Sequence, residues 1–420
     1  MKPKVLSAAV AAFLMSTLAV HAQQEVKIGV LQPLSGPVAQ VGLDAVAAVK
    51  TAVEIVNEGA DLPLSLAKSK GLSGLGGAKV KIFVSDHQGK PEIGLSETER
   101  LITQEKVHAL LGAYFSSVTG AASQAAERAG IPFVNAASTS PALTERGFKF
   151  FFRTTPTDED FSKLMFDFMK DLSAKTGKKV ESVSIFHEDT AFGSDSAKVQ
   201  NRVAKELGLK VLENITYKAQ TTSLSSEVQR LKAANADVLL PSSYTSDTFL
   251  LLKTAKELDY NPKLIVAQNA GFTDPTFIKT MGKDAEGAIT RSPFNDDLAN
   301  RIPLITKVNE IFKKHSNGRE LSDVPARVFT GMMTLLDAIN RAGSTDPEKI
   351  RAALAATNIP PDQLIIPYKG VKFDGKGQNE LVRPILMQVQ KGKYCTIYPF
   401  ELASCETMYP APSWADKAKM

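Results

Sequence analysis

The chain has 420 residues, of which 43% are hydrophobic and 23% are charged, and its formal net charge is +5. This length and composition indicate a soluble globular protein of two or three domains. Basic residues are scattered among acidic ones along the whole chain, which argues against a nucleic-acid partner.

The first 22 residues have the pattern of a secretory signal peptide. Lys2 and Lys4 precede an apolar stretch, 5–20, and small residues for cleavage end at Ala22. The alternative is a membrane anchor, but the apolar stretch is shorter than the ~20 residues of a transmembrane helix. Removing the peptide lowers the net charge to +3, and no later segment is apolar enough to span a membrane. We therefore expect an exported protein without direct membrane insertion.

Strand and helix patterns alternate from residue 25 to residue 153, which is typical of a parallel, doubly wound sheet. The predicted strands are 25–31, 80–85, a short apolar strand that ends at Gly112, 131–135 and 148–153. The predicted helices are 40–57, 92–105 and about 117–129. Residues 59–78 lack periodicity and predict a loop. Its glycines do not form a phosphate loop, because no Gly-Lys-Ser or Gly-Lys-Thr follows them.

The same alternation starts again after Pro156 and predicts a second lobe. Its predicted helices are 161–176, 194–207, 225–234 and 245–258, and its predicted strands are 180–187, 210–217, 237–241 and 263–267. The later predicted elements are a strand at 284–294 that crosses back, helices at 303–315, 325–342 and 347–356, and a final hairpin of 371–373 with 384–390.

Late helices that rejoin an earlier lobe require several chain crossings, and such crossings form a hinge. We therefore predict an α/β fold of two doubly wound, Rossmann-like lobes joined by a multi-crossing hinge around a cleft for a small ligand. The predicted ranges are 23–153 with about 290–360 for the first lobe, 154–289 with about 361–394 for the second, and 395–420 for a tail.

The only two cysteines, Cys395 and Cys405, lie ten positions apart near the C-terminus. In an exported chain this spacing predicts a structural disulfide. Free thiols are one alternative. A metal pair is another, but it lacks a nearby histidine.

Two hydroxyl-bearing turns in the stretch 110–140 each follow a predicted strand. Ser116 and Ser117 open a helix after the first strand, and Thr139 follows the second. Ligands of open parallel sheets bind at the carboxyl ends of strands, and a helix N-terminus favours an anion there. The alternative is that these hydroxyls only cap helices. Two such turns on successive strands favour a site for a carboxylate.

Several segments together resemble the periplasmic solute-binding proteins of ABC importers, above all the type I group that binds leucine, isoleucine and valine. These segments are VKIGVLQPLSGPVAQVG (26–42), GAYFSSVTGAAS (112–123), IPFVNAASTSPALTERG (131–147), FFRTTP (151–156), HEDTAFG (187–193) and DAEGAI (284–289). The resemblance covers nearly all of residues 25–390. It implies a Venus-flytrap clamp in the periplasm, no catalytic residues, no cofactor or metal, and permease subunits of the inner membrane as partners; we expect a monomer.

The resemblance also implies roles for residues of the first lobe. The Ser116 hydroxyl and N–H would bind the ligand carboxylate, the Ala137 carbonyl would accept an ammonium proton, and Thr139 would add donors. The walls of this half would be formed by Val41, Tyr114, Phe115 and Ser138.

The second lobe departs from the family pattern. Phe192 stands where the family usually has a tyrosine, whereas Tyr244 matches the pocket tyrosine. The position of the ligand-facing acid falls at Asn269 or Ala270, and neither carries a charge. A buried ammonium without an acid is costly.

Two readings of the second lobe therefore stay open. Either Asp189 or Asp247 replaces the acid, or the ligand has no ammonium, as in an aromatic or branched keto acid. An apolar pocket with Phe272 as a further wall would suit the second ligand class. Branched-chain or other hydrophobic amino acids remain candidates under the first.

Two other function classes fit the sequence less well than a binding protein. An extracytoplasmic hydrolase would need a nucleophile, a base and an orienting acid, but no G-x-S-x-G occurs and the five histidines lie in unrelated contexts. A ligand-binding sensor would use the same clamp, but it would need a separate membrane receptor. We therefore expect a binding protein and not an enzyme.

Overall fold

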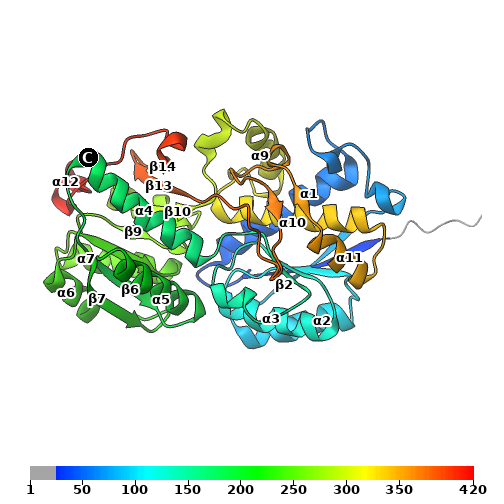
Figure 1. The fold of residues 1–420 in the computed structure, drawn as a ribbon, viewed down its shortest axis with the longest axis horizontal. Helices are drawn as coiled ribbons and strands as arrows, with labels where there is room; N and C mark the ends of the chain where they lie inside the picture. Colours follow the sequence, from blue (N-terminus) through cyan, green and yellow to red (C-terminus); the bar gives the residue numbers. More distant parts are fainter. Residues whose placement is uncertain (1–24) are drawn as a thin grey trace, which may run out of the picture.

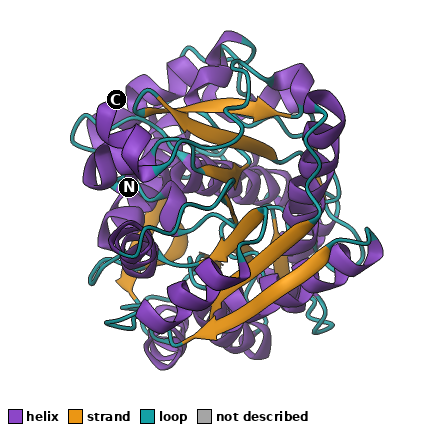
Figure 2. Ribbon diagram, turned by 90° about the vertical axis from the view of Figure 1, so that its left-hand side faces the viewer, coloured by secondary structure: helices purple, strands orange, loops and turns teal. Residues whose placement is uncertain are grey.

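The computed structural model describes residues 25–420, and the predicted signal peptide lies outside them. Two α/β lobes lie side by side (Figure 1), and helices surround the strands of the second lobe, which faces the viewer in Figure 2. Among the residues described, none of the helices combines the length and apolar character needed to cross a membrane.

The sheet of the first lobe has the strand order β2-β1-β3-β4-β5, and every neighbouring pair is parallel. Its strands are β1 (Val26–Gln32), β2 (Val80–Asp86), β3 (Ala109–Leu111), β4 (Phe133–Asn135) and β5 (Phe151–Arg153). Gly29 in β1 leaves room for the neighbouring strand β3, since a Cβ there would lie 2.6 Å from Leu110. The apolar residues of β1 are buried on both faces, as expected for a parallel sheet.

Helices from two distant parts of the chain cover this sheet. They are α1 (Ala39–Glu58), α2 (Pro91–Thr103), α3 (Ser116–Ala129), α9 (Leu304–His315), α10 (Asp323–Ala342) and α11 (Pro347–Ala355). The helices α2 and α3 pack together on one face, and α10 lies beside α1 on the other (Figure 1). Gly331 lets α10 approach the turn after β4, because a Cβ there would lie 2.7 Å from the Cβ of Ala136.

The second lobe has two adjoining sheets, of order β7-β6-β8 and β14-β13-β10-β9, and strands from late in the chain are antiparallel in the second of them. Its parallel strands are β6 (Ser182–Glu188), β7 (Lys210–Tyr217), β8 (Val238–Ser242), β9 (Val266–Ala267) and β10 (Ile289–Ser292). A parallel bridge between Leu239 and Ile265 connects β8 to β9. The antiparallel strands β13 (Ile385–Gln390) and β14 (Lys393–Tyr398) extend the sheet beyond β10.

Side chains of β6 alternate between two apolar cores, as the period of a strand requires. Val183 and Ile185 pack with α4 (Asp158–Thr176) and α5 (Ala191–Glu206). Phe186 packs with α6 (Ser225–Ala234) and α7 (Thr245–Glu257) on the opposite face.

The predicted final hairpin is wrong. The short strand β12 (Val371–Lys372) pairs with β11 (Asn358–Ile359), whereas β13 pairs with β10 and β14. Apolar residues between 364 and 373 belong to the core of the first lobe, although the sequence placed them in the second. Two-residue strands have no detectable period, so the sequence pattern did not reveal this pairing.

The C-terminal tail packs on the second lobe instead of standing apart from it. Cys395 lies in β14 and is joined to Cys405 by a disulfide. Further on, Trp414 opens the short helix α12 (Trp414–Lys419) and donates from its indole nitrogen to the Tyr260 carbonyl at 2.7 Å.

The chain crosses between the lobes three times, after β5, after β10 and between β12 and β13. Arg153, at the end of β5, ties two of these crossings together. Its buried guanidinium donates to Gln378 Oε1 at 2.5 Å and to the Ser140 carbonyl at 2.6 Å. Burial lowers the pKa of Arg153 to about 10, so it stays charged at neutral pH.

Candidate functional site

The two hydroxyl-bearing turns form one structural unit at the carboxyl ends of β3 and β4. Asn135 ends β4, and its Oδ1 accepts hydrogen bonds from the backbone of Ala137 at 3.1 Å and of Ser138 at 3.0 Å. The Ser138 hydroxyl then donates to the Ala113 carbonyl at 3.0 Å in the other turn. A short polar side chain at the end of β4 therefore fixes both turns against each other.

Ser116 is the first residue of α3, and it does not cap that helix. Phe115 occupies the capping position, and no side-chain capping bond is present there. The first N–H groups of a helix lack partners within the helix, so this end of α3 favours an anion. The interpretation of Ser116 as a simple cap is therefore wrong.

A cavity lies where these turns meet the second lobe. Its free volume is only about 20 Å³, far below the ~300–1,000 Å³ of ligand pockets, so the lobes must separate to admit a solute. The residues that line it are all buried: Tyr114, Ser116, Ala137, Ser138, Thr139, Phe192, Tyr244, Asn269, Ala270, Arg291 and Arg327.

Nine of the ten ligand-binding residues predicted from the sequence line this cavity. The exception is Phe115, whose ring packs behind the wall with its centroid 4.4 Å from that of Tyr244. Val41 and Phe272 are buried in the cores and are not lining residues.

Aromatic rings from both lobes form one wall of the cavity. The Tyr244 ring lies 5.7 Å from Tyr114 and 5.2 Å from Phe192 between centroids. Burial raises the pKa of Tyr114 and of Tyr244, so both phenols are neutral at physiological pH. The Tyr114 hydroxyl has no hydrogen-bond partner within residues 25–420.

Arg291 on β10 brings a buried positive charge to the second-lobe side of the cavity. It is only 2% exposed, its guanidinium lies 3.7 Å from the centroid of the Phe161 ring, and one Nη donates to Thr139 Oγ1 at 3.4 Å. The same nitrogen lies 3.7 Å from Asp158 Oδ1. Its Nε and its other Nη have no hydrogen-bond partner in the described part of the chain.

Burial, and next the positive charge of Arg327, lower the pKa of Arg291 to about 9. Arg291 therefore remains protonated at neutral pH, and an anion beside it would stabilise that charge.

Arg327 on α10 reaches the first-lobe side of the same cavity. It forms an ion pair with Asp323 one turn earlier, and its Nη1 donates to the Ala137 carbonyl at 2.9 Å. Asp323 also accepts a hydrogen bond from Asn269 Nδ2 at 2.9 Å and one from the Ser292 hydroxyl at 2.7 Å. The carboxylate thus binds residues of both lobes.

Sequence reasoning missed both arginines. Arg291 lies in an apolar strand, and Arg327 in a helix that is buried on nearly every side. Charged residues at buried positions of regular elements are rare unless they are paired. An arginine inside an otherwise apolar strand or helix is therefore the sequence signal that could have revealed them.

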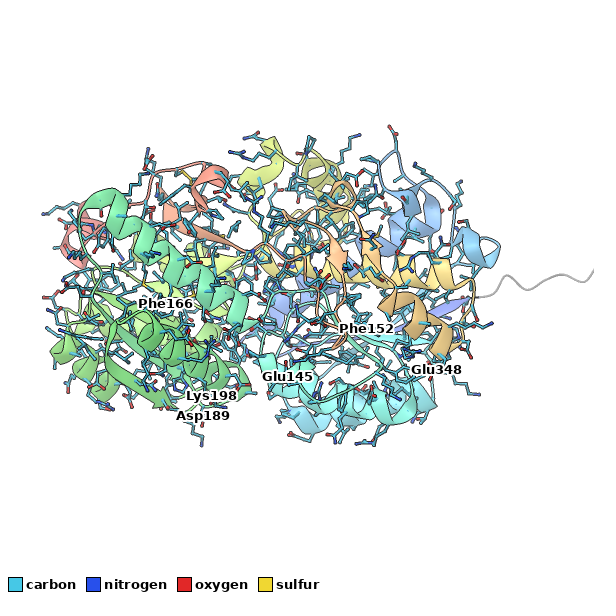
Figure 3. All side chains as sticks on the ribbon, viewed as in Figure 1. Glu145, Phe152, Phe166, Asp189, Lys198 and Glu348 are labelled. Carbon is cyan, nitrogen blue, oxygen red and sulfur yellow. A yellow bond between two sulfur atoms is a disulfide. The ribbon has the colours of Figure 1, made fainter. Side chains whose placement is uncertain are left out.

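Neither acid proposed as a replacement lines the cavity. Asp189 lies at the rim of the second lobe (Figure 3) and accepts a hydrogen bond from the Ala219 backbone at 2.9 Å. Asp247 accepts one from the Gln220 backbone at 3.1 Å. The acid position is filled by Asn269 and Ala270, which both have the left-handed backbone, with φ of 69° and 58°.

Among the described residues that line the cavity, none is a histidine or a carboxylate. Both ring nitrogens of His187 are within hydrogen-bond distance of partners outside it, Nδ1 of the Glu188 carbonyl at 2.9 Å and Nε2 of the Thr216 hydroxyl at 2.9 Å. In residues 25–420, no group of three or more His, Cys, Asp or Glu side chains is arranged to hold a metal ion.

Comparisons with known proteins agree with this architecture. The model of the periplasmic binding protein family matches residues 25–393. The Leu/Ile/Val-binding protein homolog 7 of Brucella suis biovar 1 is 30% identical over 415 residues, which cover 98% of this chain and 100% of that protein.

Solved structures share the fold at low sequence identity. The leucine-binding protein LivK of Thermotoga maritima has a TM-score of 0.75 at 23% identity, covering 89% of this chain and 97% of that one. A solute-binding protein of an ABC transporter from Rhodopseudomonas palustris BisB5, solved with 3,4-dihydroxybenzoic acid, has a TM-score of 0.73 at 18% identity, covering 94% and 99%. Because the family model spans most of the chain, this protein belongs to the periplasmic binding protein family.

Proposed function

We propose that this protein captures a small carboxylate in the cavity between its lobes and delivers it to the permease of an ABC importer. Membership in the family implies a solute-binding protein of the ABC-transporter type with an extracytoplasmic location. The observation that carries the finer proposal is the convergence of Ser116, Thr139 and the buried Arg291 on one cavity.

Each of these groups favours a negative charge. Ser116 opens α3, where the helix dipole and free N–H groups attract an anion. Arg291 adds a guanidinium with two unpartnered nitrogens, which can form charge-assisted hydrogen bonds to a carboxylate. The neutral rings of Tyr114, Phe192 and Tyr244 supply an apolar wall for the rest of the ligand.

Contacts between the lobes support a clamp that closes over its ligand. The Ser140 hydroxyl of the first lobe donates to Asp195 Oδ2 on α5 at 2.5 Å. Phe192, Tyr244 and Ala270 of the second lobe pack against the core of the first. Since the lining residues are buried, a ligand enters only when the lobes separate at the three crossings.

The test is isothermal titration calorimetry with a panel of small carboxylates, comparing the unmodified protein with the double variant Ser116→Ala, Thr139→Ala. A hydrogen bond to a charged group contributes about 1.5–3 kcal/mol, so we expect the double variant to lose at least tenfold in affinity. Ser117→Ala is the matched control, because Ser117 lies next in α3 but does not line the cavity.

Unchanged affinity in the double variant would show that the anion site lies elsewhere. Delivery is tested separately, by measuring whether the liganded protein stimulates ATP hydrolysis by a reconstituted ABC transporter encoded beside its gene. Tight ligand binding without such stimulation would contradict the transport part of the proposal.

A further inference from the structure

The groups that would accept the protons of an α-ammonium already accept hydrogen bonds from side chains of the protein. The Ala137 carbonyl accepts a hydrogen bond from Arg327 Nη1 at 2.9 Å. The nearby Asp323 carboxylate is shared among Arg327, Asn269 and Ser292. The Ala137 carbonyl has a second lone pair, but a cationic group that approached it would lie beside the positive charge of Arg327.

Donors, by contrast, are in excess around the cavity. Nε and one Nη of Arg291, Nε of Arg327 and the Tyr114 hydroxyl are buried without a hydrogen-bond partner among residues 25–420. A buried donor left unpaired costs ~1–3 kcal/mol, and more if it is charged. A ligand rich in oxygen acceptors would satisfy these groups, whereas an ammonium would add more donors.

The charge balance points in the same direction. Arg291 and Arg327 both line the cavity, so two guanidinium groups face any ligand in it. Asp323 pairs with Arg327, and Asp158 lies 3.7 Å from Arg291, but neither acid is a lining residue. A like charge within a few ångströms disfavours a cation, and an anion gains from both arginines.

We propose that the ligand is a carboxylate with a second oxygen acceptor and no α-ammonium, such as a 2-oxo acid or a hydroxylated aromatic acid. In this assignment Arg291 binds the ligand directly, through the nitrogens that lack partners. Arg327 determines specificity, because it places a positive charge at the carbonyl that an amino acid would use. The inference rests on the proposed function and names the ligand class of that same cavity.

The first experiment is calorimetry of the full-length mature protein with ligand pairs that differ only at the α-carbon. Suitable pairs are phenylpyruvate against L-phenylalanine and 4-methyl-2-oxopentanoate against L-leucine, with 4-hydroxybenzoate as an aromatic acid. We expect the amine-free member of at least one pair, or the aromatic acid, to bind at least tenfold more tightly than either amino acid. Equal or tighter binding of the amino acids would overturn the inference.

The second experiment removes each arginine. Arg291→Gln should weaken binding of the amine-free ligand at least tenfold, because a neutral amide replaces the charge-assisted bonds. Arg327→Gln should free the Ala137 carbonyl and leave Asp323 without its cation. The expected result for Arg327→Gln is a smaller ratio between the affinities for the amine-free ligand and for its amino acid.

The ratio is the decisive readout, because a merely structural role of Arg327 would weaken both ligands alike. The matched control is Arg341→Gln on the same helix. Arg341 pairs with Asp337 at 2.8 Å with the same four-residue spacing, but neither residue lines this cavity. If circular dichroism shows that Arg327→Gln does not fold, Asn269→Glu replaces it. An acid at this position would pair with an ammonium, so it should also reduce the ratio between the affinities for the amine-free ligand and for its amino acid.

The two proposals fail in different ways. If amino acids bind more tightly than their oxo acids and Ser116→Ala, Thr139→Ala abolishes that binding, the carboxylate clamp stands and the amine-free assignment falls. If Arg291→Gln leaves the affinity for the amine-free ligand unchanged, Arg291 is not a ligand-binding residue. If no carboxylate of either kind binds, both proposals fall.

Discussion

The two sides of the cavity are built in different ways. On the first-lobe side, the turn around Ser116 and the turn around Thr139 lie close together in sequence and are fixed by local bonds such as those of Asn135. The other side, called the assembled side, consists of Arg291 from β10 of the second lobe and Arg327 from α10, a late helix of the first lobe. One side is a local motif, and the other depends on how distant elements are packed.

This difference separates two tasks in ligand recognition. The local motif presents neutral hydroxyl and N–H donors at the start of a helix, which suits any carboxylate. The assembled side supplies two fixed charges, which discriminate between ligands that share that carboxylate. We therefore expect substitutions in the turns to change affinity for all ligands, and substitutions of the arginines to change the order of preference.

The largest effect on the local side is expected from Phe115→Ala. Phe115 does not line the cavity, but its ring packs against His87, Tyr114 and Tyr244. Truncating a buried phenylalanine typically costs about 3–5 kcal/mol of unfolding free energy. Urea unfolding should show this loss. A loss below about 1 kcal/mol would mean that the aromatic wall does not depend on support from behind.

Acid should lower the unfolding free energy through His87, whose ring packs against Phe115 behind the local side. Burial lowers the pKa of His87 to about 4 despite the adjacent Asp86 charge, whereas the ordinary value is 6.5. The unfolded chain therefore binds a proton between these pH values that the folded chain does not. Stability from this group is complete above about pH 6.5 and falls by ~1.4 kcal/mol per pH unit down to about pH 4.

His87→Gln isolates this contribution from the other titrating groups. Unfolding free energies of the parent and the variant are measured by urea denaturation from pH 7 to pH 4. As the pH falls, the parent should lose more stability than the variant. Arg291, with its pKa of about 9, stays charged throughout this range. A difference that stays constant with pH would contradict the assignment to His87.

The smallest effect is expected from the hydrogen bond between Ser140 and Asp195, which joins the two lobes. Ser140→Ala removes the donor to Asp195, which is partly exposed, so the loss should be near the lower end of ~1.5–3 kcal/mol. We expect the ligand to dissociate about tenfold faster, with little change in the association rate, in stopped-flow measurements. An unchanged dissociation rate would show that this bond does not hold the clamp closed.

Most of the fold follows from patterns along the chain. The alternating strands and helices of both lobes lie close to their predicted positions, because each is long enough to show its period. The strands β11 and β12 have two residues each and no period, so their pairing and their place in the first lobe were not predictable.

The same reasoning divides the candidate site. Ser116 and Thr139 were accessible to sequence reasoning because a turn after a strand places its residues at the sheet edge without further information. The roles of Arg291 and Arg327 depend on their distance from Thr139 and Ala137, which tertiary packing alone determines. Phe115 was predicted to line the cavity, but it packs behind Tyr244 instead, because a residue next to a lining position can point away from the cavity.

The three crossings of the chain between the lobes also determine when each lobe can fold during synthesis. The core of the first lobe needs α9, α10 and the segment up to Phe373, and the second lobe needs β13, β14 and Trp414. Neither core is complete until ribosomes have made nearly the whole polypeptide. The nascent chain therefore lacks a finished globule until its synthesis is nearly over.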